Sequence, residues 1–216
     1  MNAPLSHLAS PAFRDWLTAR LDPLEFEQST SLTSDYDLSP DQRPVETEPL
    51  TPASVLIGLI ERDYGYSVLL TRRVDTMRRH AGQVAFPGGR RDPGETPWQA
   101  ALREAQEEVG LEPNLVQLAG LSSPYQTGTG YLITPVVGFI ASDHALVANP
   151  DEVADIFETP FDFLMDLSNH EEHEREMPTG EKRRFYAMTH NEQYIWGATA
   201  GMLRALRRRL YGDPDA

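Results

Sequence analysis

Short runs of apolar residues, separated by polar and turn-forming residues, predict strands over much of the chain. Runs of apolar residues bounded by turn-forming residues are typical of strands in a packed sheet. Asp63, Tyr64 and Gly65 separate the first two runs closely enough to predict a hairpin. The predicted strands are 54–60, 67–71, 83–86, 115–121, 132–140, 184–188 and 193–196, and the last two form a second predicted hairpin.

The helical pattern is most complete between Pro97 and Gly110. Thr96 suits the N-cap, Gln99 completes a capping box with it, and Gly110 suits the C-terminal stop. Apolar residues recur on one face of this helix, at Trp98, Ala101, Leu102, Ala105 and Val109. Further helices are predicted around Phe13, Trp16, Leu17 and Leu21, at 161–167, and at 198–211.

Strands interleaved with helices, together with hairpins, predict an α/β (α+β) fold in which a mixed β-sheet is covered by helices. Residues 1–48 are rich in proline and acidic residues after the amphipathic stretch, so we expect an N-terminal helix followed by an extended arm. Residues 49–212 are expected to form the folded domain. No internal repeat is visible.

The formal net charge of −14 disfavours nucleic acid as a partner, because phosphates require a cationic surface. No apolar run reaches the roughly 20 residues that a membrane helix needs. The absence of cysteine excludes thiolate metal sites and fits a reducing, cytoplasmic location. Residues 71–91 differ from the rest of the chain, because six arginines and one aspartate give them a local charge of +5. This segment indicates either an anionic ligand or an ordinary solvated edge.

Glu104, Glu107 and Glu108 lie within an arc of about 100° on the predicted helix, at roughly 100° per residue. Like charges at i and i+4 destabilise a helix, and a divalent cation between them reverses that cost. Carboxylate oxygens are hard ligands, so Mg²⁺ or Mn²⁺ is the expected ion. The alternative is an acidic helix face that is simply solvated.

The loop before this helix favours the metal site. Gly88 and Gly89 allow the backbone to approach a ligand closely, and Glu95 is within reach of Arg103. The loop and the helix together form one pattern that is similar to the Nudix box. It consists of Gly89, five residues, Glu95, seven residues and Arg103-Glu104-Ala105-Gln106-Glu107-Glu108-Val109-Gly110-Leu111. Only Ala105 is smaller than the usual aliphatic residue.

The resemblance to Nudix hydrolases implies a mixed sheet between helices and metal-dependent cleavage of a diphosphate. It implies that Glu104 and Glu108 are the main metal ligands, and that Glu107 is a further ligand or the general base. It also implies that the Gly89 carbonyl joins the metal shell, while Arg103 and Glu95 orient the other groups.

A second resemblance concerns the substrate. The segment upstream of the helix is similar to the motif of the coenzyme A diphosphatase branch. The matching residues are Leu69-Leu70-Thr71-Arg72-Arg73-Val74, then Arg78, Gly82 and Phe86-Pro87-Gly88-Gly89. Val74 departs from the small residue that is usual there. The resemblance covers about residues 50–203 and implies coenzyme A as the small-molecule substrate. Four residues are then expected to bind it, each with an ordinary surface role as the alternative: Arg73, Arg78, His80 and Gln83.

Several interpretations stay open at this point. Glu152 is either an additional catalytic acid or part of a turn initiated by Asn149-Pro150-Asp151. The run from His170 to Glu174 is predicted to be a solvated loop rather than a metal site. Trp196 is predicted to belong to the core, and the arginines at 204, 207, 208 and 209 to complement a helix end. Another Nudix substrate such as ADP-ribose, a non-catalytic nucleotide sensor, and a homodimer are all compatible with the sequence.

Overall fold

The computed structural model describes residues 10–25, 32–44, 49–75, 82–142, 145–176, 180 and 182–213. The helices are α1 (Ser10–Thr18), α2 (Pro97–Val109), α3 (Phe161–Met165) and α4 (Ala198–Tyr211). The strands are β1 (Thr33–Ser34), β2 (Thr51–Arg62), β3 (Gly65–Arg73), β4 (Val84–Ala85), β5 (Gly88–Arg90), β6 (Val116–Leu121), β7 (Tyr125–Gln126), β8 (Tyr131–Ile140), β9 (Val153–Pro160), β10 (Glu171–Glu176), β11 (Lys182–His190) and β12 (Gln193–Trp196). Short 3-10 turns occur at Pro40–Gln42, Pro113–Leu115 and Leu167–Asn169.

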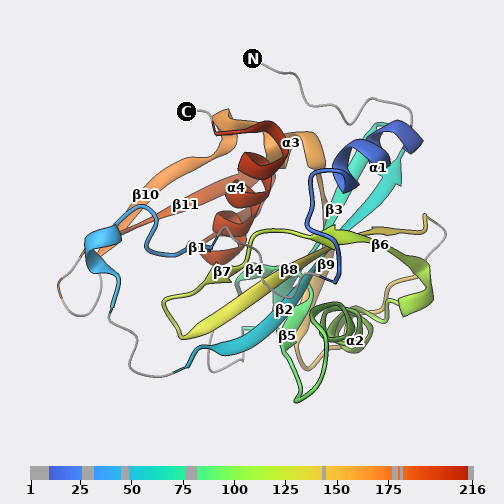
Figure 1. Cartoon of the computed structure of the whole chain (residues 1–216), viewed down its shortest axis with the longest axis horizontal. Helices are drawn as coiled ribbons and strands as arrows, with labels where there is room; N and C mark the ends of the chain where they lie inside the picture. The colour runs from blue at the N-terminus through green and yellow to red at the C-terminus, as the bar shows by residue number, and fades with distance from the viewer. Residues whose placement is uncertain are drawn as a thin grey trace.

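The central sheet is mixed. Its strands run in the order β1-β7-β8-β2-β3-β4, with β5 paired to β2, β6 to β8 and β9 to β3. Strand β2 is parallel to β8 and antiparallel to β3. Strands β10, β11 and β12 form a separate antiparallel sheet. Figure 1 shows α2 on one side of the central sheet and α4, with the second sheet beside it, on the other.

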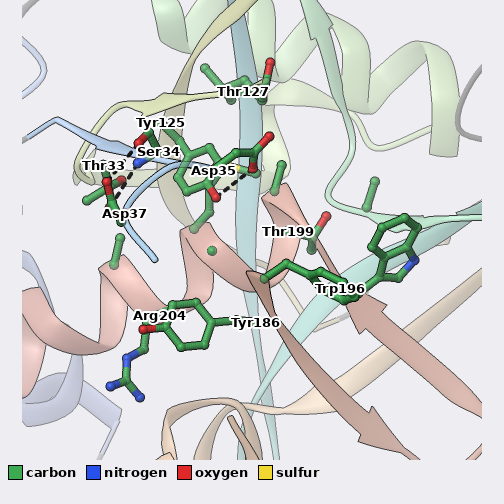
Figure 2. A pocket seen from close by; sticks show the side chains of 18 of the residues that line it. Thr33, Ser34, Asp35, Asp37, Tyr125, Thr127, Tyr186, Trp196, Thr199 and Arg204 are labelled. Carbon is green, nitrogen blue, oxygen red and sulfur yellow. Dashed lines mark hydrogen bonds between the residues drawn. The ribbon is translucent and has the colours of Figure 1, made fainter. Parts of the chain in front are cut away.

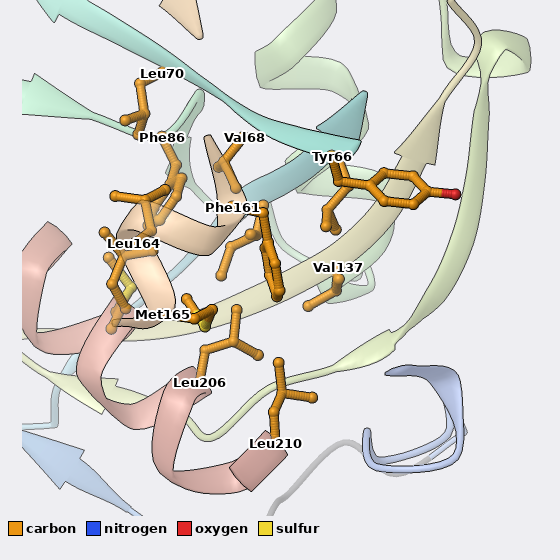
Figure 3. Packing of buried hydrophobic residues seen from close by; sticks show 14 of the residues in the cluster. Tyr66, Val68, Leu70, Phe86, Val137, Phe161, Leu164, Met165, Leu206 and Leu210 are labelled. Carbon is orange, nitrogen blue, oxygen red and sulfur yellow. The ribbon is translucent and has the colours of Figure 1, made fainter. Parts of the chain in front are cut away.

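Alternation along β2 explains why helices cover both faces of the central sheet. Successive side chains of a strand point to opposite faces. Leu56 and Ile60 pack with α2, whereas Ile57 and Leu59 belong to the cluster that includes α1, α3 and α4. All four are fully buried. Figure 3 shows the cluster that contains Ile57 and Leu59. In it, α3 residues Phe161, Leu164 and Met165 pack against Leu206 and Leu210 of α4, beneath the strand residues Val68 and Leu70.

The fold class and the predicted elements are confirmed, apart from one segment. The run from His170 to Glu174 was predicted to be a loop, but Glu171–Glu176 forms β10, and His170 itself is buried. The strand was missed because ion pairs across it replace the usual apolar alternation: Glu174 accepts from Lys182 at 2.7 Å, and Glu172 lies 3.7 Å from Arg184. Strands β1, β5, β7 and β9 were not predicted either.

The N-terminal arm packs on the domain in the parts that the structure describes. Phe13 and Leu17 of α1 are fully buried in the main core, and β1 pairs in parallel with β7. The division at residue 48 stays a prediction, because the described arm shares both core and sheet with the rest. Among the described residues, no helix is long and apolar enough to cross a membrane.

Candidate active site

Helix α2 begins and ends as its sequence predicts. The Thr96 hydroxyl accepts from the Gln99 backbone N–H at 3.3 Å, and the Gln99 side chain accepts from the Thr96 N–H at 2.9 Å. Pro97 occupies the first turn, and Gly110 takes the left-handed conformation at φ 67°. These caps fix the register of the helix, and with it the direction in which each glutamate points.

Two of the three glutamates on the acidic face of α2, Glu104 and Glu108, are turned toward the protein and are not part of a solvated surface. Glu108 is only 2% exposed and Ala100 is fully buried, whereas Glu107 is exposed. Gly89 of β5 lies so close to Glu104 that a β-carbon at position 89 would overlap the Glu104 carboxyl group. The sequence predicts that the three glutamates lie on one arc of the helix. In the structure, the segment that contains Gly88 and Gly89 covers Glu104 and Glu108.

Burial shifts the ionisation of these carboxyls. Desolvation, with smaller contributions from Glu104 and Glu152, raises the pKa of Glu108 to about 7, although Arg73 opposes the shift. Desolvation likewise raises the pKa of Glu104, which Arg103 partly offsets and which Glu107 and Glu152 increase. The Glu152 carboxylate therefore belongs to the same electrostatic cluster as the helix glutamates.

Two arginines hold this cluster in place. Arg103 donates to both carboxylate oxygens of Glu95, at 2.9 and 3.0 Å, which confirms the predicted pair. Its Nη1 atom also donates to Glu104 at 2.9 Å and to Glu107 at 3.1 Å. Arg73 lies 3.5 Å from Glu108. Charge-assisted bonds of this kind are geometrically specific, so Arg103 ties the preceding loop to the helix.

The turn before β9 brings Glu152 to the site. The Asn149 N–H donates to the Glu108 carbonyl at 2.9 Å, and the Glu152 carbonyl accepts from Val74 at 3.0 Å. The segment is thus pinned between the end of α2 and the end of β3. The turn and a role for Glu152 are compatible, because the turn is what positions the side chain.

The donor set fits a divalent cation. The largely buried Glu108 forms one electrostatic cluster with three other carboxylates, those of Glu104, Glu107 and Glu152, and hard oxygen ligands are what Mg²⁺ and Mn²⁺ require. In the described part of the chain, no three acidic or imidazole groups already converge as ligands of one ion. Arg103 and Arg73 occupy carboxylate oxygens instead, so an entering cation would exchange with these guanidinium groups.

The protonation of Glu108 predicts how stability depends on pH in metal-free protein. A carboxyl whose folded pKa is raised binds protons more tightly in the folded state, so its contribution is complete below about pH 4.5 and is lost as pH rises through about 7. A shift of this size corresponds to about 3 kcal/mol. Urea unfolding in EDTA should show lower stability at pH 8 than at pH 5.5, and Glu108→Gln should flatten that difference. Equal pH slopes in both proteins would contradict the assignment.

The NUDIX domain family model matches residues 50–179. This chain belongs to the Nudix family. The "Uncharacterized Nudix hydrolase NudL" of Pectobacterium atrosepticum is 38% identical over 178 residues, which cover 82% of this chain and 91% of that protein. The protein of the same name from Yersinia pestis is 39% identical over 160 residues, covering 73% and 79% respectively.

Among solved structures, the Nudix hydrolase RenU of M. smegmatis is 26% identical with a TM-score of 0.46, over 56% of this chain and 77% of that chain. At this score it adds nothing about substrate. The sequence relatives make this chain a Nudix hydrolase, in a family that acts on small molecules with divalent metal ions.

A cavity of about 550 Å³ on the α4 side of the central sheet reaches two residues that contact the acidic cluster. Arg73, which contacts Glu108, and Gly88, which precedes Gly89, both line it. Most of its walls come from outside the family match: from the arm at 33–38 and from 183–213. Its charged lining residues are six arginines and three aspartates, although the chain as a whole carries −14.

Figure 2 shows how the arm forms one wall of this cavity. The Tyr125 hydroxyl donates to Asp35 at 2.9 Å, and the Gly128 N–H donates to the other Asp35 oxygen at 2.7 Å. Asp37 accepts from the backbone N–H and the hydroxyl of Ser34. These aspartates are therefore engaged in holding the arm.

The predicted binding residues have different outcomes. Arg73 and Gln83 line the cavity, while Arg78 and His80 lie outside the described residues. Trp196 was predicted to be in the core, but it is half-buried and lines the cavity, where Figure 2 shows it.

Among the four arginines of α4, the prediction was partly wrong. Arg208 and Arg209 do lie in the last turn, but Arg204 and Arg208 line the cavity. The Arg204 guanidinium lies 5.1 Å from the centre of the Tyr186 ring. Sequence reasoning also missed Arg183 and Phe185. Their position depends on strand pairing with distant segments, for which only the predicted hairpin at 184–196 gave a partial signal.

Proposed function

We propose that this Nudix hydrolase cleaves the diphosphate of coenzyme A, with Mg²⁺ or Mn²⁺, to 3′,5′-ADP and 4′-phosphopantetheine. The observation that carries the proposal is the arginine-rich cavity, which shares Arg73 and Gly88 with the acidic cluster. Coenzyme A carries a 3′-phosphate besides its diphosphate, and arginine recognises phosphate well. Arg73 is also the arginine of the segment that resembles the coenzyme A diphosphatase motif.

In this proposal Glu104, Glu108 and Glu107, with the Gly89 carbonyl, hold the metal. A bound divalent cation neutralises diphosphate charge and makes a nearby water molecule more acidic. Arg73 would donate to a phosphate oxygen, and Arg103, which contacts Glu95, Glu104 and Glu107, would keep Glu104 and Glu107 in position. Water attacks one phosphorus in line, a glutamate accepts its proton, and the bond to the bridging oxygen breaks with the second phosphate as leaving group. Positioning and charge stabilisation supply most of the rate.

Two glutamates compete for the role of base, and their replacement predicts different outcomes. Glu107 is exposed and lies on the cluster, so it can both accept a proton and exchange it with solvent. We expect Glu107→Gln to lower kcat by about 10²- to 10⁴-fold, the usual contribution of a general base, and Glu152→Gln to lower it by about tenfold. The pH–rate profile checks this, because loss of the base removes its acidic limb. The reverse order of effects would assign the base to Glu152.

Product analysis tests the substrate. The protein is incubated with coenzyme A and either Mg²⁺ or Mn²⁺, and the products are separated by chromatography. We expect 3′,5′-ADP and 4′-phosphopantetheine in equal amounts, and no turnover in EDTA. Much faster turnover of ADP-ribose would make the substrate proposal wrong. Nucleotide binding without metal-dependent turnover would instead favour a sensor, which the intact Glu104, Glu107 and Glu108 disfavour.

We also propose a cytoplasmic location and a homodimer with the N-terminal arm as one contact. The absence of cysteine supports the first of these, and the net charge of −14 disfavours a nucleic-acid partner. Light scattering of the full chain and of a chain lacking residues 1–9 tests the dimer, which predicts twice the monomer mass.

A further inference from the structure

Two arginines face each other across the second sheet. In the β10–β11 pairing, Arg175 lies directly opposite Arg183, and both line the cavity. Like charges opposite one another destabilise a pair of strands. Each also extends over a cavity shared with Arg73, which contacts the acidic cluster. An anion between them would remove the repulsion.

Within the part of the chain that the structure describes, Arg183 is held in position by contacts other than an ion pair. Its guanidinium lies 4.9 Å from the centre of the Tyr36 ring, and its Nε atom is buried with no hydrogen-bond partner among the described residues. Neither Arg183 nor Arg175 forms an ion pair within the described part of the chain. Asp35, the nearby carboxylate of the arm, already accepts from Tyr125 and Gly128.

An aromatic surface continues from this arginine pair. Residues opposite one another or two apart on a strand share a face, so Phe185 and Trp196 point to the same side of the sheet as Arg183. Their ring centres are 5.5 Å apart, both are half-buried, and both line the cavity. Aromatic faces and arginine together are what a phosphorylated nucleoside requires, because bases stack on rings and phosphates pair with guanidinium groups.

We propose that this face of the second sheet is the nucleotide subsite of the cavity. Arg175 and Arg183 bind a phosphomonoester that is separate from the scissile diphosphate, and Phe185 and Trp196 stack on the adjoining base. The proposal deepens the proposed function and rests on it, because coenzyme A is a substrate whose adenosine carries such a phosphate. The specificity would then lie at Arg175, near the end of the matched family region, and at Arg183, Phe185 and Trp196 beyond it.

Ligand binding without turnover tests the subsite. Titration calorimetry in EDTA compares 3′,5′-ADP with 5′-AMP, which lacks the second phosphomonoester. We expect about tenfold to a hundredfold tighter binding of 3′,5′-ADP, the range expected for hydrogen bonds between charged partners. Arg183→Gln and Arg175→Gln should remove that preference and leave 5′-AMP binding unchanged. Lys182→Gln, one residue along the same strand and paired on the surface with Glu174, is the matched control and should keep it.

The base-stacking half has its own measurement. Binding of 3′,5′-ADP should quench tryptophan fluorescence, and Trp196→Leu should abolish most of that signal and weaken 3′,5′-ADP and 5′-AMP equally. If Arg204→Gln removes the phosphate preference and Arg183→Gln does not, the subsite lies on the other wall and the proposal is wrong.

The outcome separates the two proposals. Coenzyme A turnover with an unchanged phosphate preference in the Arg175 and Arg183 variants would overturn the subsite and leave the proposed function standing. The predicted binding preference without coenzyme A turnover would overturn the proposed function alone. Thermal unfolding of each variant confirms that it is folded before either result is interpreted.

Discussion

Glu108→Gln is expected to lower kcat by about 10³-fold or more while the protein stays folded. A metal ion stabilises the charge of the transition state by several kcal/mol, and about 4 kcal/mol corresponds to a factor of 10³. Glutamine keeps the shape of the side chain but cannot carry the negative charge that the ion requires. Steady-state kinetics at saturating Mg²⁺ provide the measurement.

Stability distinguishes this loss from a folding defect. Because burial raises the pKa of Glu108 to about 7, the folded protein already accommodates a neutral group at that position below neutral pH. Glu108→Gln should therefore be at least as stable as the parent at pH 8 in EDTA. An inactive variant that is also less stable there would not support the assignment.

Two further variants test the assignment, one expected to lose activity and one that is a control. Glu104→Gln should show a comparable loss, because its carboxylate contacts the same Gly88–Gly89 segment and belongs to the same carboxylate cluster. Glu112→Gln, an exposed position just beyond the helix that accepts from Gln106 at 3.1 Å, should retain full activity. Full activity in Glu104→Gln and Glu108→Gln would remove the basis for a metal-dependent site here.

The site could be predicted from sequence to the extent that it depends on local spacing. Capping residues fix both ends of α2, and helical periodicity then places Glu104, Glu107 and Glu108 together. Periodicity does not say what covers an arc of a helix. The burial of Glu108 comes from contact with β5 and from the turn that ends at Glu152, and both lie elsewhere in the chain.

The cavity could not be predicted, because it is assembled from segments that are distant in sequence. The arm reaches it through the pairing of β1 with β7, which joins residues about ninety positions apart. The other wall includes β10, in which Glu174 and Glu172 pair with Lys182 and Arg184 of the next strand, and whose sequence gives no hydrophobic signal. Trp196 is a large apolar residue of the type that usually lies in the core, and only the tertiary arrangement leaves it half-buried at the cavity.

Gly89→Ala is expected to lower kcat by about 10²-fold, although it adds a single methyl group. Gly89 does not have a positive φ, so alanine is compatible with the backbone itself. The added β-carbon would overlap the Glu104 carboxyl group, and the strand pairing of Gly89 with Ser54 restricts any retreat of the loop. Either Glu104 leaves its position or β5 shifts, and a displacement of about 1 Å at a catalytic group can cost 10²-fold.

Gly212→Ala separates this contact from a general effect of replacing glycine. Gly212 follows α4 on the other face of the sheet, has φ 84°, and has open space where a β-carbon would be. Its replacement should cost about 1–3 kcal/mol of stability through backbone strain and leave kcat unchanged. Gly89→Ala should instead lose activity far beyond its loss of stability and require more Mg²⁺ for half-maximal rate. If both variants lose stability and activity in the same proportion, close contact between β5 and Glu104 does not organise the site.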